Sequence, residues 1–139
     1  MFNLLTDLNW LAVLLADVAA FVLGGVWFVV LFPRFYASAL GRENEPPSKP
    51  AAIFLVGPLL CNTVAVVTSA ILLRLLGVHS LGGALLFGGF VGFGYLTSTT
   101  VNTGINPNIP RPLRYGLVSG AQFFVSSLVM SVVLVLVSR

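Results

Sequence analysis

Residues 9–31 read NWLAVLLADVAAFVLGGVWFVVL, and this stretch decides the class of fold. It is continuously apolar instead of alternating, which favours a helix over a membrane barrel strand. A helix rises about 1.5 Å per residue, so that about 20 apolar residues cross the ~30 Å hydrocarbon core of a bilayer. The stretch holds Asp17 and has no Lys or Arg ahead of it, so we expect a transmembrane helix that is retained in the mature protein and not a signal peptide.

The rest of the chain repeats this pattern three times. Residues 51–76, 81–101 and 113–137 are also apolar and long enough to span a bilayer. Of the 139 residues, 58% are hydrophobic and 8% are charged, whereas soluble domains carry about a quarter charged residues. This composition excludes an ordinary water-soluble fold. We predict one domain over residues 1–139, an all-α membrane protein folded as an antiparallel bundle of four transmembrane helices.

The connections orient the bundle in the membrane. A tight turn at residues 77–80 makes the second and third helices antiparallel neighbours. The first and third connections, residues 32–50 and 104–112, are rich in proline, and we expect the proline and charge of the first to keep it non-helical. Arg74 and Arg139 lie on the opposite side. These two connections and the start of the fourth helix hold the other basic residues: Arg34, Arg42, Lys49, Arg111 and Arg114. Because short loops rich in Lys and Arg stay in the cytoplasm, we expect both termini outside it.

Residues that carry chemistry are sparse. Cys61 is the single cysteine and His79 the single histidine, so neither a disulfide framework nor a cysteine or histidine metal cluster is available. The sequence has no serine, histidine and aspartate set and no phosphate-cradling loop. We therefore expect a protein that is not an enzyme and takes no cofactor. The net charge of +3 follows from membrane topology, so the expected partner is the lipid bilayer and not nucleic acid.

Small residues recur at the spacing that lets helices approach closely. Ala12, Ala16, Ala20 and Gly24 follow one another at four-residue intervals and form one groove on the first helix. The same interval separates two further pairs: Gly88 and Gly92, and Gly116 and Gly120. Lipid gives no hydrophobic force between helices, so we interpret these residues as packing faces. The alternative is that the glycines of the third helix line a narrow permeation path. Because these faces exceed what one small bundle needs, we expect a homo-oligomer or a membrane-protein partner.

Asp17 is the acidic residue that lies well inside a span, and no basic residue lies at comparable depth. Counting along the helices places it near the level of four polar residues: Asn62, Thr63, Ser126 and Ser127. An intramembrane carboxyl is costly and usually faces the interior, so we expect a hydrogen-bonded polar layer and a neutral acid that donates a hydrogen bond. The functional alternative is a proton or cation site.

A second polar group follows the inner half of the third helix: Thr97, Ser98, Thr99, Thr100, Asn102 and Thr103. Such hydroxyls are readily satisfied within an apolar span by hydrogen bonds to carbonyls of their own helix. The alternative is a wet vestibule formed with Gln122 beneath the Asp17 layer, which makes one candidate proton site: Asp17, Asn62, Thr97, Thr100, Asn102 and Gln122. We interpret Trp10, Trp27 and Tyr115 as aromatic anchors near the membrane interfaces.

Three segments resemble the membrane family called domain of unknown function 1761: Asn9-Trp10-Leu11-Ala12-Val13, Gly24-Gly25-Val26-Trp27-Phe28 and Thr97-Ser98-Thr99-Thr100. The resemblance covers essentially the whole chain. It implies four transmembrane helices, a mostly bacterial distribution and no established activity. With the predicted topology, the expected location is therefore a bacterial inner membrane.

The chain departs from the family pattern in two places. The family motif after the first helix usually reads Gly-x-x-Trp-Tyr-Ser-Pro, whereas Trp27 is followed by Phe28-Val29-Val30. The fourth helix of the family commonly opens with an Asp and a Tyr-His pair, and the corresponding positions are Ser119, Gln122 and Phe123. The chain therefore lacks, at these positions, the Asp and His that proton chemistry of that pattern would need, and we infer that Asp17 is the substitute acid.

Two classes of function follow from the sequence. The first is a structural or assembly component that packs its helices against a partner. The second is a proton- or ion-linked permeation protein for a small solute, using Asp17 and the hydroxyl face of the third helix. A hydrated cavity joining these groups favours the second class, and a dry, tightly packed interior favours the first.

Overall fold

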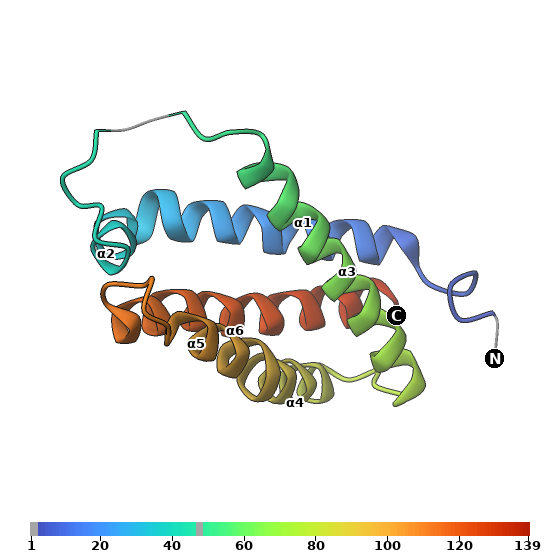
Figure 1. Ribbon diagram of the computed structural model, residues 1–139. Coiled ribbons are helices and arrows are strands. Elements are labelled where there is room, and N and C mark those ends of the chain that lie inside the picture. Colours follow the sequence, from blue (N-terminus) through green and yellow to red (C-terminus); the bar gives the residue numbers. More distant parts are fainter. Residues whose placement is uncertain (1–2, 47–48) are drawn as a thin grey trace.

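The computed structural model describes residues 3–46 and 49–139 (Figure 1). These residues form helices and no strand, which confirms the predicted fold class. In chain order the elements are α1 (Trp10–Gly25), the π-helical segment η1 (Val26–Leu31), α2 (Pro33–Ala39), α3 (Ile53–Leu75), α4 (Leu81–Val91), the π-helical segment η2 (Gly92–Thr97), α5 (Ser98–Gly104) and α6 (Pro112–Val137).

The helices form four spans that are long and apolar enough to cross a membrane. Two of them are composite, because η1 continues α1 and because η2 joins α4 to α5. The spans are Trp10–Leu31, Ile53–Leu75, Leu81–Gly104 and Pro112–Val137. They agree with the predicted stretches to within about three residues at each end, and the usual disagreement over helix ends is about one to two residues. The chain is thus a multi-pass membrane protein.

Local sequence signals set where these helices begin. The Asn9 side chain accepts a hydrogen bond from the Ala12 amide at 3.1 Å, and the Ser80 hydroxyl accepts one from the Gly83 amide at 3.1 Å. Each side chain satisfies an amide that the first turn of a helix leaves free. Gly77, at φ +63, makes the tight turn between α3 and α4, in the left-handed region that glycine enters without steric cost.

The first connection contains a helix that the sequence did not predict. We expected proline and charge to keep residues 32–50 non-helical, yet Pro33 opens α2 at its first turn. Proline is well tolerated there, since its missing N–H would be unpaired in any case. This short helix contacts α6.

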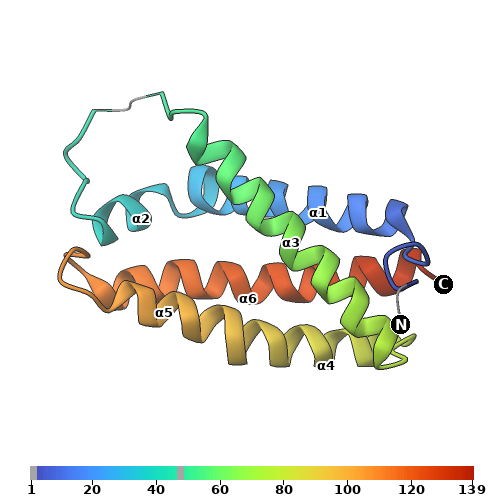
Figure 2. The same ribbon diagram turned by 45° about the vertical axis from the view of Figure 1, so that its right-hand side comes forward.

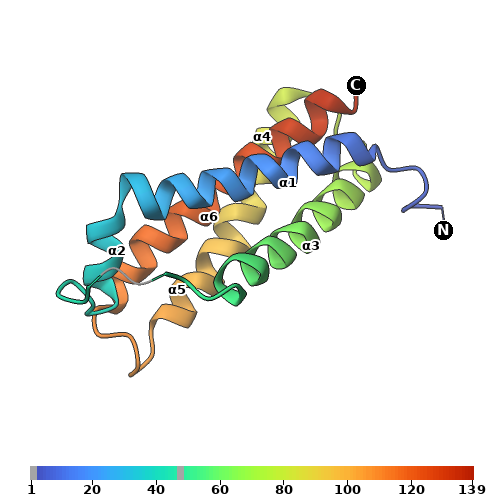
Figure 3. The same ribbon diagram turned by 90° about the horizontal axis from the view of Figure 1, so that it is seen from above.

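α6 lies at the centre of the bundle. It packs against α1, α2, α4 and α5, and Figures 1 and 3 show it between α1 and the α4–α5 helix. In an apolar stretch of 18 residues within α6, 44% of the residues are buried, against 11% in the corresponding stretch of α3. The hydrophobic core therefore follows α6, with Met130 and Leu134 packed on Ala12, Val66 and Ala84.

α3 is the peripheral helix. Figure 2 shows it crossing α1 obliquely, with its first turns displaced from the other helices. Its C-terminal half buries Val66, Ser69 and Leu73, whereas its first half carries exposed apolar side chains such as Phe54 and Leu60. The bundle is therefore tightest at the end that holds the chain termini. We call this the terminal end, and we call the opposite end, with α2 and residues 105–111, the loop end.

Candidate functional site

Asp17 lies in the contact between α1 and α3. Its Oδ1 accepts a hydrogen bond from Asn62 Nδ2 at 2.6 Å, and its Oδ2 lies 2.6 Å from Thr63 Oγ1. Asn62 Nδ2 also donates to the main-chain oxygen of Asp17 at 3.1 Å. Adjacent residues of α3 thus hold both carboxyl oxygens, and this cluster of three residues is named the α1–α3 clamp.

The Thr63 hydroxyl has two acceptors within hydrogen-bond distance. Thr63 Oγ1 lies 2.6 Å from Asp17 Oδ2 and 3.0 Å from the Leu59 carbonyl oxygen of its own helix. Because the hydroxyl carries one hydrogen, it shares that hydrogen between the carboxyl and the carbonyl. The neutral state of Asp17 stays a prediction from the sequence.

The serines at the level of Asp17 do not join it. Ser126 and Ser127 are buried on α6, where the Ser126 hydroxyl accepts from Gln122 Nε2 at 2.8 Å. Gln122 faces α1 at Gly24, where a Cβ in place of the glycine hydrogen would lie 3.3 Å from Gln122 Nε2. The hydrogen bonds therefore form one group between α1 and α3 and a separate group within α6, and the expected single polar layer is divided.

Most serine and threonine hydroxyl groups of the third span donate hydrogen bonds to carbonyls of the same span. Ser98 donates to the Gly94 carbonyl at 2.6 Å, and Thr100 donates to the Leu96 carbonyl at 2.7 Å. Thr97 instead links two helices, because its hydroxyl donates to the Gly120 carbonyl of α6 at 3.0 Å. Such bonds satisfy the hydroxyls without water.

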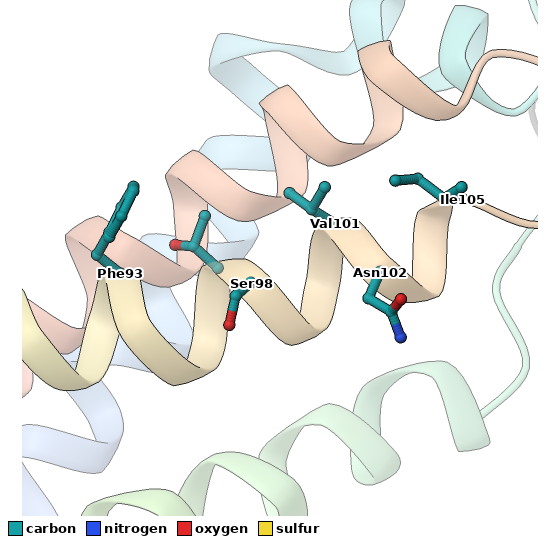
Figure 4. Close-up of a pocket in the computed structure, with 6 residues that line it drawn as sticks. Phe93, Ser98, Val101, Asn102 and Ile105 are labelled. Atoms are coloured by element: carbon teal, nitrogen blue, oxygen red, sulfur yellow. The ribbon is translucent and has the colours of Figure 1, made fainter.

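The six residues of the predicted proton site are therefore not assembled into one site. Asp17 and Asn62 are joined in the α1–α3 clamp, Thr97 bonds to Gly120 of α6, and Gln122 lies on the side of α6 that faces Gly24 of α1. Asn102 is exposed, and Figure 4 shows it pointing, like Ser98, away from the side of the helix that carries Val101. The sequence gives depth along each helix but not its rotation, which is why residues at similar levels were grouped wrongly.

Two cavities lie elsewhere on the bundle. One, of about 340 Å³, is a shallow hollow on the third span, lined by Phe93, Thr97, Ser98, Val101, Asn102 and Ile105 (Figure 4). The other, of about 430 Å³, lies at the terminal end beside the Arg74–Asp7 ion pair, whose atoms are 3.0 Å apart, and beside His79. Asp17 lines neither of these two cavities. The described residues contain no group of three or more His, Cys, Asp or Glu side chains placed to hold a metal.

The predicted small-residue faces lie at helix contacts. Ala12, Ala16 and Ala20 are buried on α1. A Cβ on Gly88 or Gly92 would come within 2.8 or 2.9 Å of Ser127, and one on Gly120 within 3.0 Å of Thr97. A Cβ on Gly116 would likewise lie 3.2 Å from the Val101 side chain. These glycines allow α6 to approach the third span closely.

The aromatic anchors lie towards the two ends. Trp10 is exposed at the terminal end. Trp27, within η1, donates from Nε1 to the Val118 carbonyl of α6 at 3.0 Å. Tyr115 stacks at 6.4 Å between ring centroids on Tyr36 of α2. Burial chiefly, and then Tyr115, raise the pKa of Tyr36 above its ordinary value, against a smaller lowering by Arg42.

A basic cluster at the loop end was missed by the sequence reasoning. Arg111 Nη1 and Arg114 Nη1 both donate to the Ser38 hydroxyl oxygen of α2, at 2.8 and 2.7 Å. Glu43 Oε1 lies 2.7 Å from Arg111 Nη1. A backbone hydrogen bond, and then Arg111, lower the pKa of the Glu43 carboxyl. Ser38 lies far from both arginines in sequence, so no local pattern reveals the contact.

A family model described as "Protein of unknown function (DUF1761)" matches residues 11–135. The chain belongs to this family. The match covers nearly the whole of the four spans and confirms the resemblance given by the sequence. No curated protein and no solved structure matches the chain.

The residues at which this DUF1761 member departs from the family pattern differ in burial and in contacts. Ser119 and Gln122 are buried on α6, whereas Phe123 is exposed. Trp27 is followed by Phe28, whose ring lies 4.6 Å from that of Tyr36. The positions that carry an Asp and a Tyr-His pair in the resembling pattern thus hold no titratable group here, which leaves Asp17 as the acid within the spans.

Proposed function

We propose that this protein is a structural component of a bacterial inner membrane, which associates with a second copy of itself through the third span and catalyses no reaction. The observation that carries the proposal is the α1–α3 clamp. Both oxygens of Asp17 are taken by side chains of the neighbouring helix, so the carboxyl is used to join helices. An intramembrane acid whose two oxygens both lie within hydrogen-bond distance of side chains on a neighbouring helix supports packing more than permeation.

The third span carries a second face that no helix of the bundle covers. A Cβ built on Gly82 or Gly89 would meet nothing within 4 Å, in contrast to Gly88 on the adjacent face. Gly82 and Gly89 are two turns apart and so share one side of α4. Small residues let the backbones of two membrane helices approach closely, and a second copy would supply the same face by symmetry.

Leucine at Gly89 tests this association. The substitution Gly89→Leu fills the open face without a clash inside the bundle, so it should keep the fold and raise the dissociation constant of the oligomer. Gly25→Leu on α1 is the matched control, since nothing lies within 4 Å of that glycine either. The oligomeric state is measured by light scattering in detergent and by cross-linking in vesicles. A monomeric parent protein, or equal effects of the two variants, would contradict the proposal.

Proton- or ion-linked permeation is the second candidate, because Asp17 is an acid within a span and is only partly buried. It is tested by pH-driven flux in vesicles holding the parent protein or Asp17→Asn, whose amide does not titrate. The structural proposal expects both to match empty vesicles. A flux that is present in the parent and absent in a folded Asp17→Asn variant would favour permeation.

A further inference from the structure

The basic cluster at the loop end carries more positive charge than its own partners balance. Arg111 and Arg114 place two guanidinium groups on one oxygen, the hydroxyl of Ser38. Glu43 pairs with Arg111, while the ion pairs found among the described residues do not include Arg114. Two cations that share a neutral acceptor repel each other, and an anion placed between them would relieve that repulsion.

The chemistry of the cluster matches a phosphate. A guanidinium group offers five N–H donors in a planar fork that fits phosphate oxygens, and the one bond from Arg114 to Ser38 leaves most of its donors free. The Ser38 hydroxyl accepts from both arginines and keeps its own hydrogen for a further acceptor. Three side chains can therefore donate to one anion.

The surroundings of Arg114 indicate that the anion is a lipid headgroup. Arg114 lies in the first turn of α6, at the border of an apolar span. Leu117 follows one turn deeper on the same side of the helix and is 66% exposed. A phospholipid places its phosphate at such a border and its acyl chains beside the apolar surface below it. A free phosphate ion would make no use of that apolar surface.

We propose that Ser38, Arg111 and Arg114 bind the phosphate of an anionic phospholipid, whose acyl chain lies along Leu117. This site is independent of the proposed self-association, since it lies at the start of α6 and not on the open face of the third span. Bound lipid stabilises the folded state by mass action, which makes binding visible as a rise in the unfolding temperature.

The first test compares phosphatidylglycerol, phosphatidylcholine and inorganic phosphate, each added to the detergent-solubilised parent protein, Arg114→Gln and Arg42→Gln. Arg42, which pairs with Glu45 at 2.6 Å at the same end, is the control for net charge. Phosphatidylglycerol should raise the unfolding temperature of the parent and of Arg42→Gln, and Arg114→Gln should lose most of that rise. Equal losses in both variants, or an undiminished rise in Arg114→Gln, would refute a built site. An equal rise with inorganic phosphate would refute the lipid assignment.

The second test leaves the arginines intact. A photoreactive residue at position 117 should cross-link to phosphatidylglycerol several-fold more than to phosphatidylcholine in mixed vesicles. Position 60 on α3 is the control, because Leu60 is 61% exposed at a comparable distance from the start of its helix. Equal cross-linking of the two lipids at position 117, or the same preference at position 60, would overturn the proposal.

Discussion

Replacing Gly88 by alanine should destabilise the bundle, whereas the same change at the adjacent Gly89 should not. A Cβ at position 88 would lie 2.8 Å from the Ser127 carbonyl oxygen and 3.0 Å from Leu128 Cα, and both atoms belong to the backbone of α6. Backbone atoms of a central helix cannot move aside cheaply. Overpacking of this kind typically costs about 1–3 kcal/mol.

The control at Gly89 isolates that cost. Alanine is a better helix former than glycine by about 1 kcal/mol, and this gain applies equally to the two neighbouring positions. Within one chain the new methyl group at position 89 meets nothing within 4 Å, and dilution of the protein to the monomer removes the proposed contact with a second copy. The free energies of unfolding of Gly88→Ala and Gly89→Ala should therefore differ by about 1–3 kcal/mol, which is the overpacking cost alone.

The assay is reversible unfolding of both variants in mixed detergent micelles, titrated with a denaturing detergent. Equal unfolding midpoints for Gly88→Ala and Gly89→Ala would refute the close approach of α4 to α6. A Gly89→Ala variant that is the less stable of the two would show that the packing face of the third span is assigned to the wrong side.

Three further predictions concern the ends of the bundle. A reporter active only outside the cytoplasm should work when fused after Arg139 and fail when inserted near Asn44, because basic loops stay inside; the reverse pattern would invert the topology. Trp27→Phe should lower the free energy of unfolding by about 0.5–1.5 kcal/mol through loss of the bond to the Val118 carbonyl, and an unchanged unfolding midpoint would exclude that bond. Burial raises the pKa of Tyr36 above its ordinary value of 10.0. The stability that the neutral Tyr36 phenol contributes is therefore complete below pH 10 and is lost as the pH rises through the raised pKa. The parent should therefore lose more stability than Tyr36→Phe above pH 10, and parallel pH profiles would contradict the burial of the phenol.

The sequence predicted the spans because length and continuous apolarity are sufficient for that purpose. It also predicted the level at which Asp17 meets Asn62, since depth follows from counting residues along two helices. It did not predict that Ser126 bonds to Gln122 of its own helix and not to Asp17. When a helix is apolar on all sides, hydrophobic periodicity does not determine which side faces the interior.

Other features depend on contacts between distant parts of the chain. The π-helical segments η1 and η2 each change the phase of a span, so that faces counted with a regular period no longer align beyond them. The contact of Ser38 with Arg111 and Arg114 joins α2 to the start of α6. Neither feature has a local sequence signal comparable to an apolar run.

The stability of Asp17→Asn and Asp17→Leu tests most directly the claim that Asp17 joins α1 to α3. Asparagine can donate to Thr63 and accept from Asn62 in the same geometry, whereas leucine can do neither. Hydrogen bonds between membrane helices contribute roughly 0.6–2 kcal/mol each. The account predicts that Asp17→Asn unfolds like the parent, and that Asp17→Leu loses roughly 1–3 kcal/mol. A leucine variant as stable as the parent, or an asparagine variant as unstable as leucine, would contradict it.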